Sequence, residues 1–284
     1  MCITGHIAKL NIQFDLKSSE LNKRLEKYQT NEKYVYTIRT VVVEELLFKG
    51  TKIYSSKYYD LYNDNGVIIQ YQRDLRNSKY VGAIFYSKTE AILYVLSSDI
   101  YEAEYLMSEY ATFYYILNNR DAVLIHSSSI CYKDKAYLFS AKSGTGKSTH
   151  TGLWIKLGLA EYINDDKNII VYENGTFFVC GNPWSGKHGL DNNLCVELKG
   201  IIYLKRAEKC EIHKLNKLEN YKNLLAHTLL PNPLLDNKKW EKLISILLNT
   251  NAYSLGANIS NEAVQVVKKE LDGELDEDKK WVCS

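Results

Sequence analysis

A lysine and two hydroxyl residues follow a glycine-containing loop near the middle of the chain. An apolar run, Ala136 to Phe139, leads into the loop 140–146, which is followed by Lys147-Ser148-Thr149 and a helix-like segment. A strand, such a loop, a lysine, a hydroxyl and a helix in this order are typical of a phosphate-binding loop. The alternative is a glycine-rich turn without a ligand, which we disfavour because both flanks and the lysine–hydroxyl pair fit the motif. The sequence therefore predicts a nucleotide site.

The residue types of this loop suit a phosphate chain. Glycine allows consecutive backbone N–H groups to converge on an anion, and the helix N-terminus adds partial positive charge. Lys147 would reach the outer phosphates, and the Ser148 hydroxyl would hold Mg²⁺. Ala141 stands where the usual pattern has its first glycine, which a small side chain should tolerate. The predicted nucleotide-binding residues are Ser143, Gly144, Thr145, Gly146, Lys147, Ser148 and Thr149.

Two adjacent aspartates, Asp165 and Asp166, follow 18 residues after Lys147. That spacing has room for one helix of about ten residues and a return strand, which would bring the carboxylates back to the loop. Mg²⁺ takes oxygen ligands, and mutual repulsion could raise the pKa of one aspartate and suit it to act as a base. Neighbours along a strand face opposite sides, so we expect separate roles for the two. The alternative is a polar turn that caps a strand.

The segments SAKSGTGKST and INDDK, preceded by Leu124-Ile125-His126, together resemble the nucleotide core shared by HPr kinase/phosphorylase and ATP-dependent phosphoenolpyruvate carboxykinase. The resemblance is strongest to HPr-kinase-like proteins with an unrelated N-terminal part, and it covers roughly residues 122–207. It implies an α/β (α+β) fold with a phosphoenolpyruvate-carboxykinase-like phosphate-loop kinase core and a mixed sheet, preceded by a β-rich region.

The resemblance also implies roles for single residues. Lys147 and Ser148 would carry phosphates and Mg²⁺, Asp165 would be the base on the acceptor hydroxyl, and Asp166 would be a metal-side or phosphate-side partner. His126 matches a histidine near the transferred phosphate. A histidine on a strand is often a core residue, and only its place just ahead of the loop strand, together with the resemblance, leaves an active-site role equally open.

Two departures from the family pattern narrow the expected activity. Thr149 stands where HPr kinase has an acidic residue, and the segment 181–187, GNPWSGK, replaces the glycine-rich signature tied to phosphorolysis. The resemblance therefore supports kinase chemistry, but neither HPr as substrate nor the reverse reaction. Lys187 is a candidate cation for the transferring group, with Arg206 a weaker one. The alternative for Lys187 is an ordinary surface loop with Trp184 in the core.

Composition excludes several classes of protein. A net charge of +2 does not favour nucleic acid or an anionic membrane as partner. No apolar run approaches membrane-helix length, and the first residues lack a secretion signal. The six cysteines are far apart and without a CxxC pair, so we expect reduced thiols and a cytoplasmic protein.

The chain divides into a β-rich region, residues 1–100, and a kinase domain, residues 101–284. The first region predicts an antiparallel sheet with a hairpin around Asn63-Asp64-Asn65-Gly66 and strands packed by tyrosines. It would either dock on the kinase core or recognise substrate. The kinase domain begins with a predicted helix over residues 102–117. Its tail predicts helices over 218–229, 237–248 and 262–271, a strand over 252–255, and fraying after 272.

The residues together predict an ATP- and Mg²⁺-dependent kinase. It would transfer the γ-phosphoryl group to a hydroxyl, in Ser or Thr of a peptide or protein or in a small metabolite. The alternative is a nucleotide-gated binding module with little turnover. A carboxykinase is disfavoured, because the chain is short and has no convincing histidine–lysine pair ahead of the loop. The resembling family often forms oligomers, which makes a homo-oligomer an option.

Overall fold

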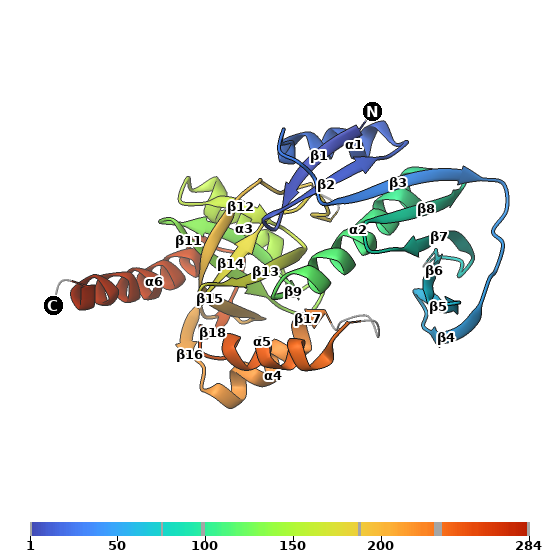
Figure 1. The fold of residues 1–284 in the computed structure, drawn as a ribbon. Helices are drawn as coiled ribbons and strands as arrows, with labels where there is room; N and C mark the ends of the chain where they lie inside the picture. The colour runs from blue at the N-terminus through green and yellow to red at the C-terminus, as the bar shows by residue number, and fades with distance from the viewer. Residues whose placement is uncertain (1, 75, 98–99, 187–188, 230–234, 283–284) are drawn as a thin grey trace. The chain divides into compact units, whose positions relative to one another are not determined.

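The computed structural model describes residues 2–74, 76–97, 100–186, 189–229 and 235–282 (Figure 1). They form two compact units, the first running to Arg120 and the second beginning at Asp121. Each unit is a mixed sheet with helices, so the predicted α/β class is confirmed at this level. In the described ranges, no helix has both the length and the apolar character that crossing a membrane requires.

The first unit is built on an eight-stranded sheet in the order β1-β2-β3-β8-β7-β6-β5-β4. Its strands are β1 (Cys2–Ile7), β2 (Leu10–Asp15), β3 (Tyr36–Val43), β4 (Thr51–Ser55), β5 (Tyr59–Asp64), β6 (Val67–Arg73), β7 (Tyr80–Tyr86) and β8 (Glu90–Leu96). The predicted hairpin is present between β5 and β6, where Asn63 Oδ1 accepts from the Gly66 amide at 2.8 Å.

The expectation of an antiparallel sheet is wrong at the middle of this unit. Strand β3 pairs in parallel with both β2 and β8. Parallel neighbours need a crossover connection. Here helix α1 (Ser19–Leu25), with a short 3₁₀ turn, Glu26–Tyr28, connects β2 to β3, and the β4–β7 meander connects β3 to β8.

Helix α2 (Ile100–Asn119) packs on β7 and β8 and so belongs to the first unit. Tyrosine rings join helix to sheet: Tyr36 stacks on Tyr115 at a centroid distance of 3.8 Å, and Tyr86 lies 4.3 Å from Tyr114. The unit boundary therefore follows Arg120 and differs from the boundary at residue 100 expected from the sequence. The physical reason is that the apolar face of α2 is buried against the first sheet.

A buried ion cluster lies at the β4–β5–β6–β7 end of this unit. The Asp60 carboxylate accepts from Lys52 Nζ at 2.8 Å, Arg73 at 2.8 Å, Ser55 Oγ at 2.7 Å and the Tyr80 hydroxyl at 2.5 Å. Burial raises the pKa of Asp60, but these hydrogen bonds outweigh burial and hold that pKa well below its ordinary value of 3.8. The carboxylate therefore stabilises the fold only while it is ionised.

We expect Asp60→Asn to lower the free energy of unfolding at pH 7 by about 3 kcal/mol, because Lys52 and Arg73 lose their buried counter-charge. Because the pKa of Asp60 is lower in the folded state than in the unfolded state, the ionised carboxylate stabilises the fold at pH values above the unfolded-state pKa. This stabilisation disappears as the pH falls below about 4 towards the folded-state pKa. Urea unfolding at pH 7 and pH 3 tests both statements. The exposed Glu44→Gln is the control, and an Asp60→Asn protein as stable as the parent at pH 7 would contradict the prediction.

The second unit contains a ten-stranded sheet whose main path is β12-β10-β11-β15-β14-β13-β9-β17, with β18 pairing β15 and β16. Its strands are β9 (Ala122–His126), β10 (Ser128–Tyr132), β11 (Lys135–Ser140), β12 (Glu161–Asn164), β13 (Lys167–Glu173), β14 (Thr176–Cys180), β15 (Cys195–Arg206), β16 (Glu211–Lys214), β17 (Thr228–Leu229) and β18 (Asn251–Ala257). Strands β11, β15 and β18 are parallel, whereas the other pairs are antiparallel, so the predicted mixed sheet is confirmed.

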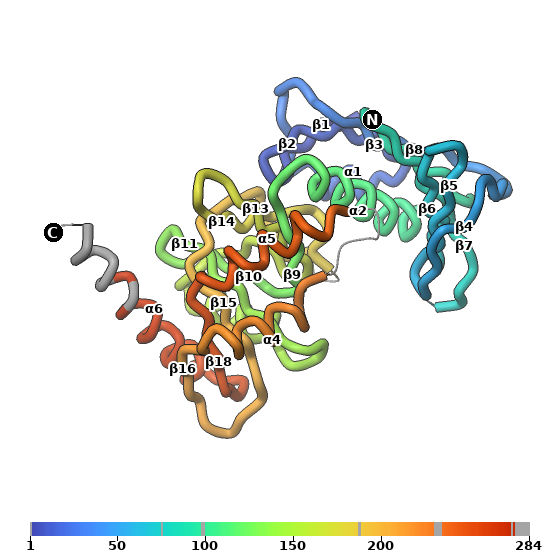
Figure 2. Tube along the Cα trace, turned by 60° about the horizontal axis from the view of Figure 1, so that its bottom comes forward, coloured from blue at the N-terminus to red at the C-terminus, as the bar shows by residue number. Residues whose placement is uncertain are grey.

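Two apolar cores border this sheet. One includes Leu224 of α4 (Lys217–His227) and Leu243 of α5 (Asn237–Leu247), and the other includes Trp154 of α3 (Lys147–Lys156) and Val267 of α6 (Asn261–Val282). Figure 2 shows α4 and α5 next to each other and α6 apart from them. Helix α6 continues to Val282, so the predicted end at residue 271 is too early.

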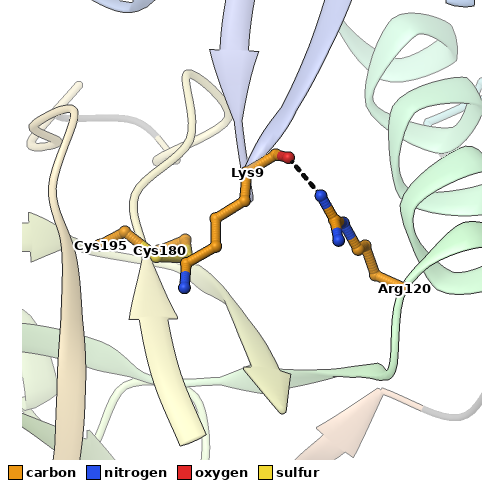
Figure 3. The surroundings of a disulfide bond; sticks show 4 residues. All are labelled: Lys9, Arg120, Cys180 and Cys195. Atoms are coloured by element: carbon orange, nitrogen blue, oxygen red, sulfur yellow. Dashed lines mark hydrogen bonds between the residues drawn. A yellow bond between two sulfur atoms is a disulfide. The ribbon is translucent and has the colours of Figure 1, made fainter. Parts of the chain in front are cut away.

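A disulfide joins Cys180 at the end of β14 to Cys195 at the start of β15 (Figure 3). The two residues are direct partners in the antiparallel register, with Cα atoms 4.1 Å apart. The expectation that all cysteines are reduced thiols is therefore wrong for this pair. The two cysteines are 15 residues apart in the sequence, and their pairing can be recognised only from the register of β14 and β15.

We expect the Cys180→Ser, Cys195→Ser double variant to lose about 3 kcal/mol of unfolding free energy, as is typical when a loop of this length is no longer closed. Denaturant unfolding with and without a thiol reductant measures the effect. The reductant should destabilise the parent protein and the Cys131→Ser control, whose cysteine is free, but leave the double variant unchanged. A parent protein insensitive to the reductant would contradict the prediction.

Candidate functional site

The loop 141–146 connects β11 to α3 in the order expected from the sequence. Gly144 and Gly146 have φ values of 75° and 117°, in the left-handed region that favours glycine. A Cβ atom added at Gly144 or Gly146 would meet no described atom within 4 Å, apart from the adjoining residues of the chain. Glycine is therefore favoured here by the backbone dihedrals and not by crowding. Gly146 is also the N-cap of α3, and no described side chain caps the helix. The first N–H groups of α3 thus face the loop without a side-chain acceptor at the cap.

Lys147, the first residue of α3, is buried and reaches back to the end of β9. Its Nζ atom lies 3.0 Å from His126 Nε2 and donates to the Ala141 carbonyl at 3.2 Å. Burial lowers the pKa of Lys147, and the negative charges of Asp166 and Asp165 oppose that shift. The structure thus brings together Lys147 and His126, which the sequence placed 21 residues apart.

Asp166 continues this chain of contacts on the other side of the histidine ring. His126 Nδ1 lies 3.1 Å from Asp166 Oδ1. With a proton on Nδ1 the ring donates to Asp166, and Nε2 is the ring nitrogen that faces Lys147 Nζ. Burial raises the pKa of Asp166, but the hydrogen bond from His126 and the charges of Lys167, His126 and Lys147 bring it below its ordinary value. From the sequence, repulsion between the two aspartates could raise the pKa of one of them. Asp166 is not that aspartate, because its pKa is lowered.

Asp165 is buried and faces different partners from its neighbour. Its Oδ1 atom accepts from Ser128 Oγ at 2.8 Å, and Ser128 Oγ lies 2.7 Å from Thr151 Oγ1 on α3. The two aspartates lie in the turn between β12 and β13 and not along a strand. They still point to separate partners, as the sequence predicted.

A buried asparagine shapes the turn that presents the doublet. Asn164 Oδ1 accepts from the amides of Asp166 and Lys167 at 3.0 and 3.2 Å, and its Nδ2 donates to the Asn182 carbonyl at 2.9 Å. An asparagine that bonds the backbone two and three residues ahead forms a stable local turn. Asn164 therefore fixes the direction in which both carboxylates leave the chain.

The described part of the segment 181–187 lies against the doublet. Gly186 has a φ of 73°, and a Cβ there would stand 3.2 Å from the Asp166 Cβ. Trp184 is fully buried, as one of the two readings of this segment expected. Lys187, the candidate cation, lies outside the described residues.

The remaining predicted residues are on the loop and the first turn of α3. Ser148 is partly buried, whereas Ser143, Gly144 and Thr149 are exposed. His150 is buried, which lowers its pKa to about 4, so it is neutral as expected. Its Nε2 atom accepts from Trp154 Nε1 at 3.3 Å, which indicates a packing role.

Sequence reasoning missed two contributors to the site. Ser128 contacts Asp165, and Thr151 contacts Ser128. Arg206, the weaker candidate cation, donates from its guanidinium to the Gly144 carbonyl at 2.5 Å. The spacing of four residues between Lys147 and Thr151, which puts both on one helix face, was a signal that could have found Thr151. Arg206 therefore holds the loop through its backbone carbonyls.

Two cavities border the loop. One of about 720 Å³ lies beside α3 and is lined by apolar Leu153, Leu204 and Ala257 together with Thr149 and Asn258. The other, of about 580 Å³, lies between the loop, the end of β15 and the end of α4. The site can therefore accept a ligand on either flank of the glycine loop.

Comparison with solved structures finds similar chains. The chain is similar to the solved structure of the HPr(Ser) kinase/phosphatase from Coxiella burnetii, with a TM-score of 0.35 and 17% sequence identity. The similarity covers 55% of this chain and 98% of that chain. No family model matches the chain, and no curated protein matches it in sequence. At this identity and TM-score, the likeness assigns no role to any residue.

Proposed function

We propose that the second unit is an ATP- and Mg²⁺-dependent kinase that transfers the γ-phosphoryl group to a hydroxyl of a peptide, protein or small metabolite. The observation that supports this most is the convergence of Lys147, His126 and the Asp165–Asp166 doublet beside a loop held open by left-handed glycines. Phosphoryl transfer requires positive charge at the phosphates, an oriented acceptor and a carboxylate to receive its proton.

In this proposal the phosphates bind on the loop from Ser143 to Thr149. The unshared amides at the start of α3 and the Lys147 ammonium supply the positive potential. The cavity of about 720 Å³ beside α3 would take the nucleoside, since its apolar leucine walls and few polar groups suit a base. Arg206 would hold the loop in its binding conformation through the Gly144 carbonyl.

The donor set also fits Mg²⁺. The described residues contain no cluster of three or more His, Cys, Asp or Glu that could hold a metal by themselves. Mg²⁺ in phosphoryl-transfer sites is commonly held by one or two carboxylates or hydroxyls together with phosphates and water. Ser148 and Asp166 are the proposed protein ligands, and the lowered pKa of Asp166 keeps it an anion at neutral pH. When bound, Mg²⁺ neutralises charge on the phosphates.

Asp165 is the proposed base on the acceptor hydroxyl. Ser128, which itself contacts Thr151, donates to its side chain in a buried position, so the carboxylate is oriented before the acceptor binds. Lys147 and His126 would stabilise negative charge on the transferring group, with Lys187 as a further proposed cation.

The test is transfer of label from γ-labelled ATP to components of a cell extract. The proposed function requires an acceptor that is labelled by the parent protein and not by Lys147→Ala. Nucleotide binding with no labelled acceptor under any condition would instead support the nucleotide-gated binding module. Absence of nucleotide binding by calorimetry would overturn both.

A further inference from the structure

The cavity of about 580 Å³ on the α4 side of the loop is rich in positive charge. Lys142, Lys205, Arg206 and His227 all line it, and its described lining contains no Asp or Glu. The cavity beside α3 shares Arg206 with it but also includes Glu208 and several apolar side chains. A group of like charges with no acidic residue in the described lining favours an anionic ligand.

Strand pairing brings this cavity next to the catalytic histidine. β17 pairs antiparallel with β9, and Thr228 lies opposite Ile125. His227 therefore leaves α4 at the same end of the strand pair as His126. The His227 ring is held in place, since Nδ1 lies 2.7 Å from the Asn223 carbonyl and the ring lies 5.7 Å from Tyr203. A bond from Nδ1–H to that carbonyl leaves Nε2 of the neutral ring as an acceptor, which suits a hydroxyl of a ligand and not its anionic group.

The surrounding charges agree with this placement. Burial lowers the pKa of His227, the hydrogen bond to Asn223 opposes that shift, and the positive charges of Lys147, His126 and Lys142 lower the pKa further. His227 therefore lies within electrostatic range of the proposed transfer site. A bound anion would relieve the repulsion among the lysine and arginine charges that line the cavity.

We propose that this cavity binds an anionic group, a carboxylate or a phosphate, carried by the acceptor close to the hydroxyl that is phosphorylated. The inference rests on the proposed kinase function and adds the substrate class. Two observations favour the acceptor over the nucleotide as occupant. The nucleoside has its own cavity on the opposite flank of the loop, and the basic cavity adjoins the end of β9 where His126 contacts Asp166.

The test uses the full chain saturated with Mg²⁺ and a non-hydrolysable ATP analogue, so that the loop is filled. Inorganic phosphate and, in a second arm, acetate are titrated and followed by the backbone amide resonances of Lys205, Arg206 and Asn223. We expect saturable shifts at these amides. Lys205→Ala should weaken anion binding about fivefold, as for one partly screened charge, and Lys205→Ala with Lys142→Ala about tenfold or more. Lys209→Ala, an exposed lysine near β15 outside the cavity, is the matched control.

Tighter binding of phosphate than of acetate would identify a phosphorylated acceptor, and the reverse would identify a carboxylate. Shifts confined to the loop 143–147, or an affinity that Lys205→Ala and the double variant leave unchanged, would overturn the inference. Failure of the kinase proposal has a different signature, because the analogue itself would not bind. The anion titration would then be performed on the nucleotide-free protein. The same variants and the same outcomes would support or overturn the anion site there.

Discussion

Lys147→Ala should lower the rate of phosphoryl transfer by at least about 1000-fold and weaken MgATP binding. The ammonium is the cation at the start of α3, and its loss removes positive charge at the position where negative charge develops during transfer. The change also removes the contact between Lys147 Nζ and His126 Nε2. The histidine, which contacts Asp166, is then held less firmly in its orientation. Transfer assays and calorimetry with MgATP measure the two effects separately.

The matched control for this variant is Lys156→Ala, an exposed lysine in the last turn of the same helix. It should retain parental nucleotide affinity and transfer. Circular dichroism should show both variants folded. If Lys147→Ala binds MgATP and transfers phosphate as well as Lys156→Ala, the loop is not the phosphate site.

Asp165→Asn should reduce transfer by about 1000-fold while changing MgATP affinity by no more than about threefold. Asparagine has nearly the shape of aspartate, and its amide oxygen can still accept from Ser128 Oγ, so the turn should persist. What the variant loses is the carboxylate that receives the acceptor proton. Single-turnover transfer, with nucleotide affinity measured in parallel, separates this loss from a binding defect.

The neighbouring substitution Asp166→Asn provides the comparison. Asp166 is the proposed Mg²⁺ ligand and contacts His126, so its replacement should raise the Mg²⁺ concentration needed for half-maximal activity. Asp165→Asn should not change this Mg²⁺ requirement. Normal turnover by Asp165→Asn would exclude it as the base, and an equal Mg²⁺ effect in both variants would show that the aspartates do not have separate roles.

Local features of this protein could be predicted from the sequence because neighbouring residues determine them. The glycine loop, its preceding strand and α3 are present because left-handed glycines and a periodic apolar pattern act over a few residues. The hairpin between β13 and β14 follows from Glu173-Asn174-Gly175 for the same reason, with Asn174 and Gly175 at positive φ. Separate partners for Asp165 and Asp166 were likewise predicted, although a turn and not a strand produces them.

Contacts between distant segments were decided only by the tertiary structure. Sheet order places Cys180 opposite Cys195, β3 parallel to β8, and His227 beside the end of β9. The same order brings Ser128 to Asp165 and Arg206 to the Gly144 carbonyl. Side-chain types and local spacing carry no information about which strands become neighbours, because that choice depends on burying whole apolar faces at once. The sequence by itself therefore identified the proposed chemistry, and the fold determined which groups surround it.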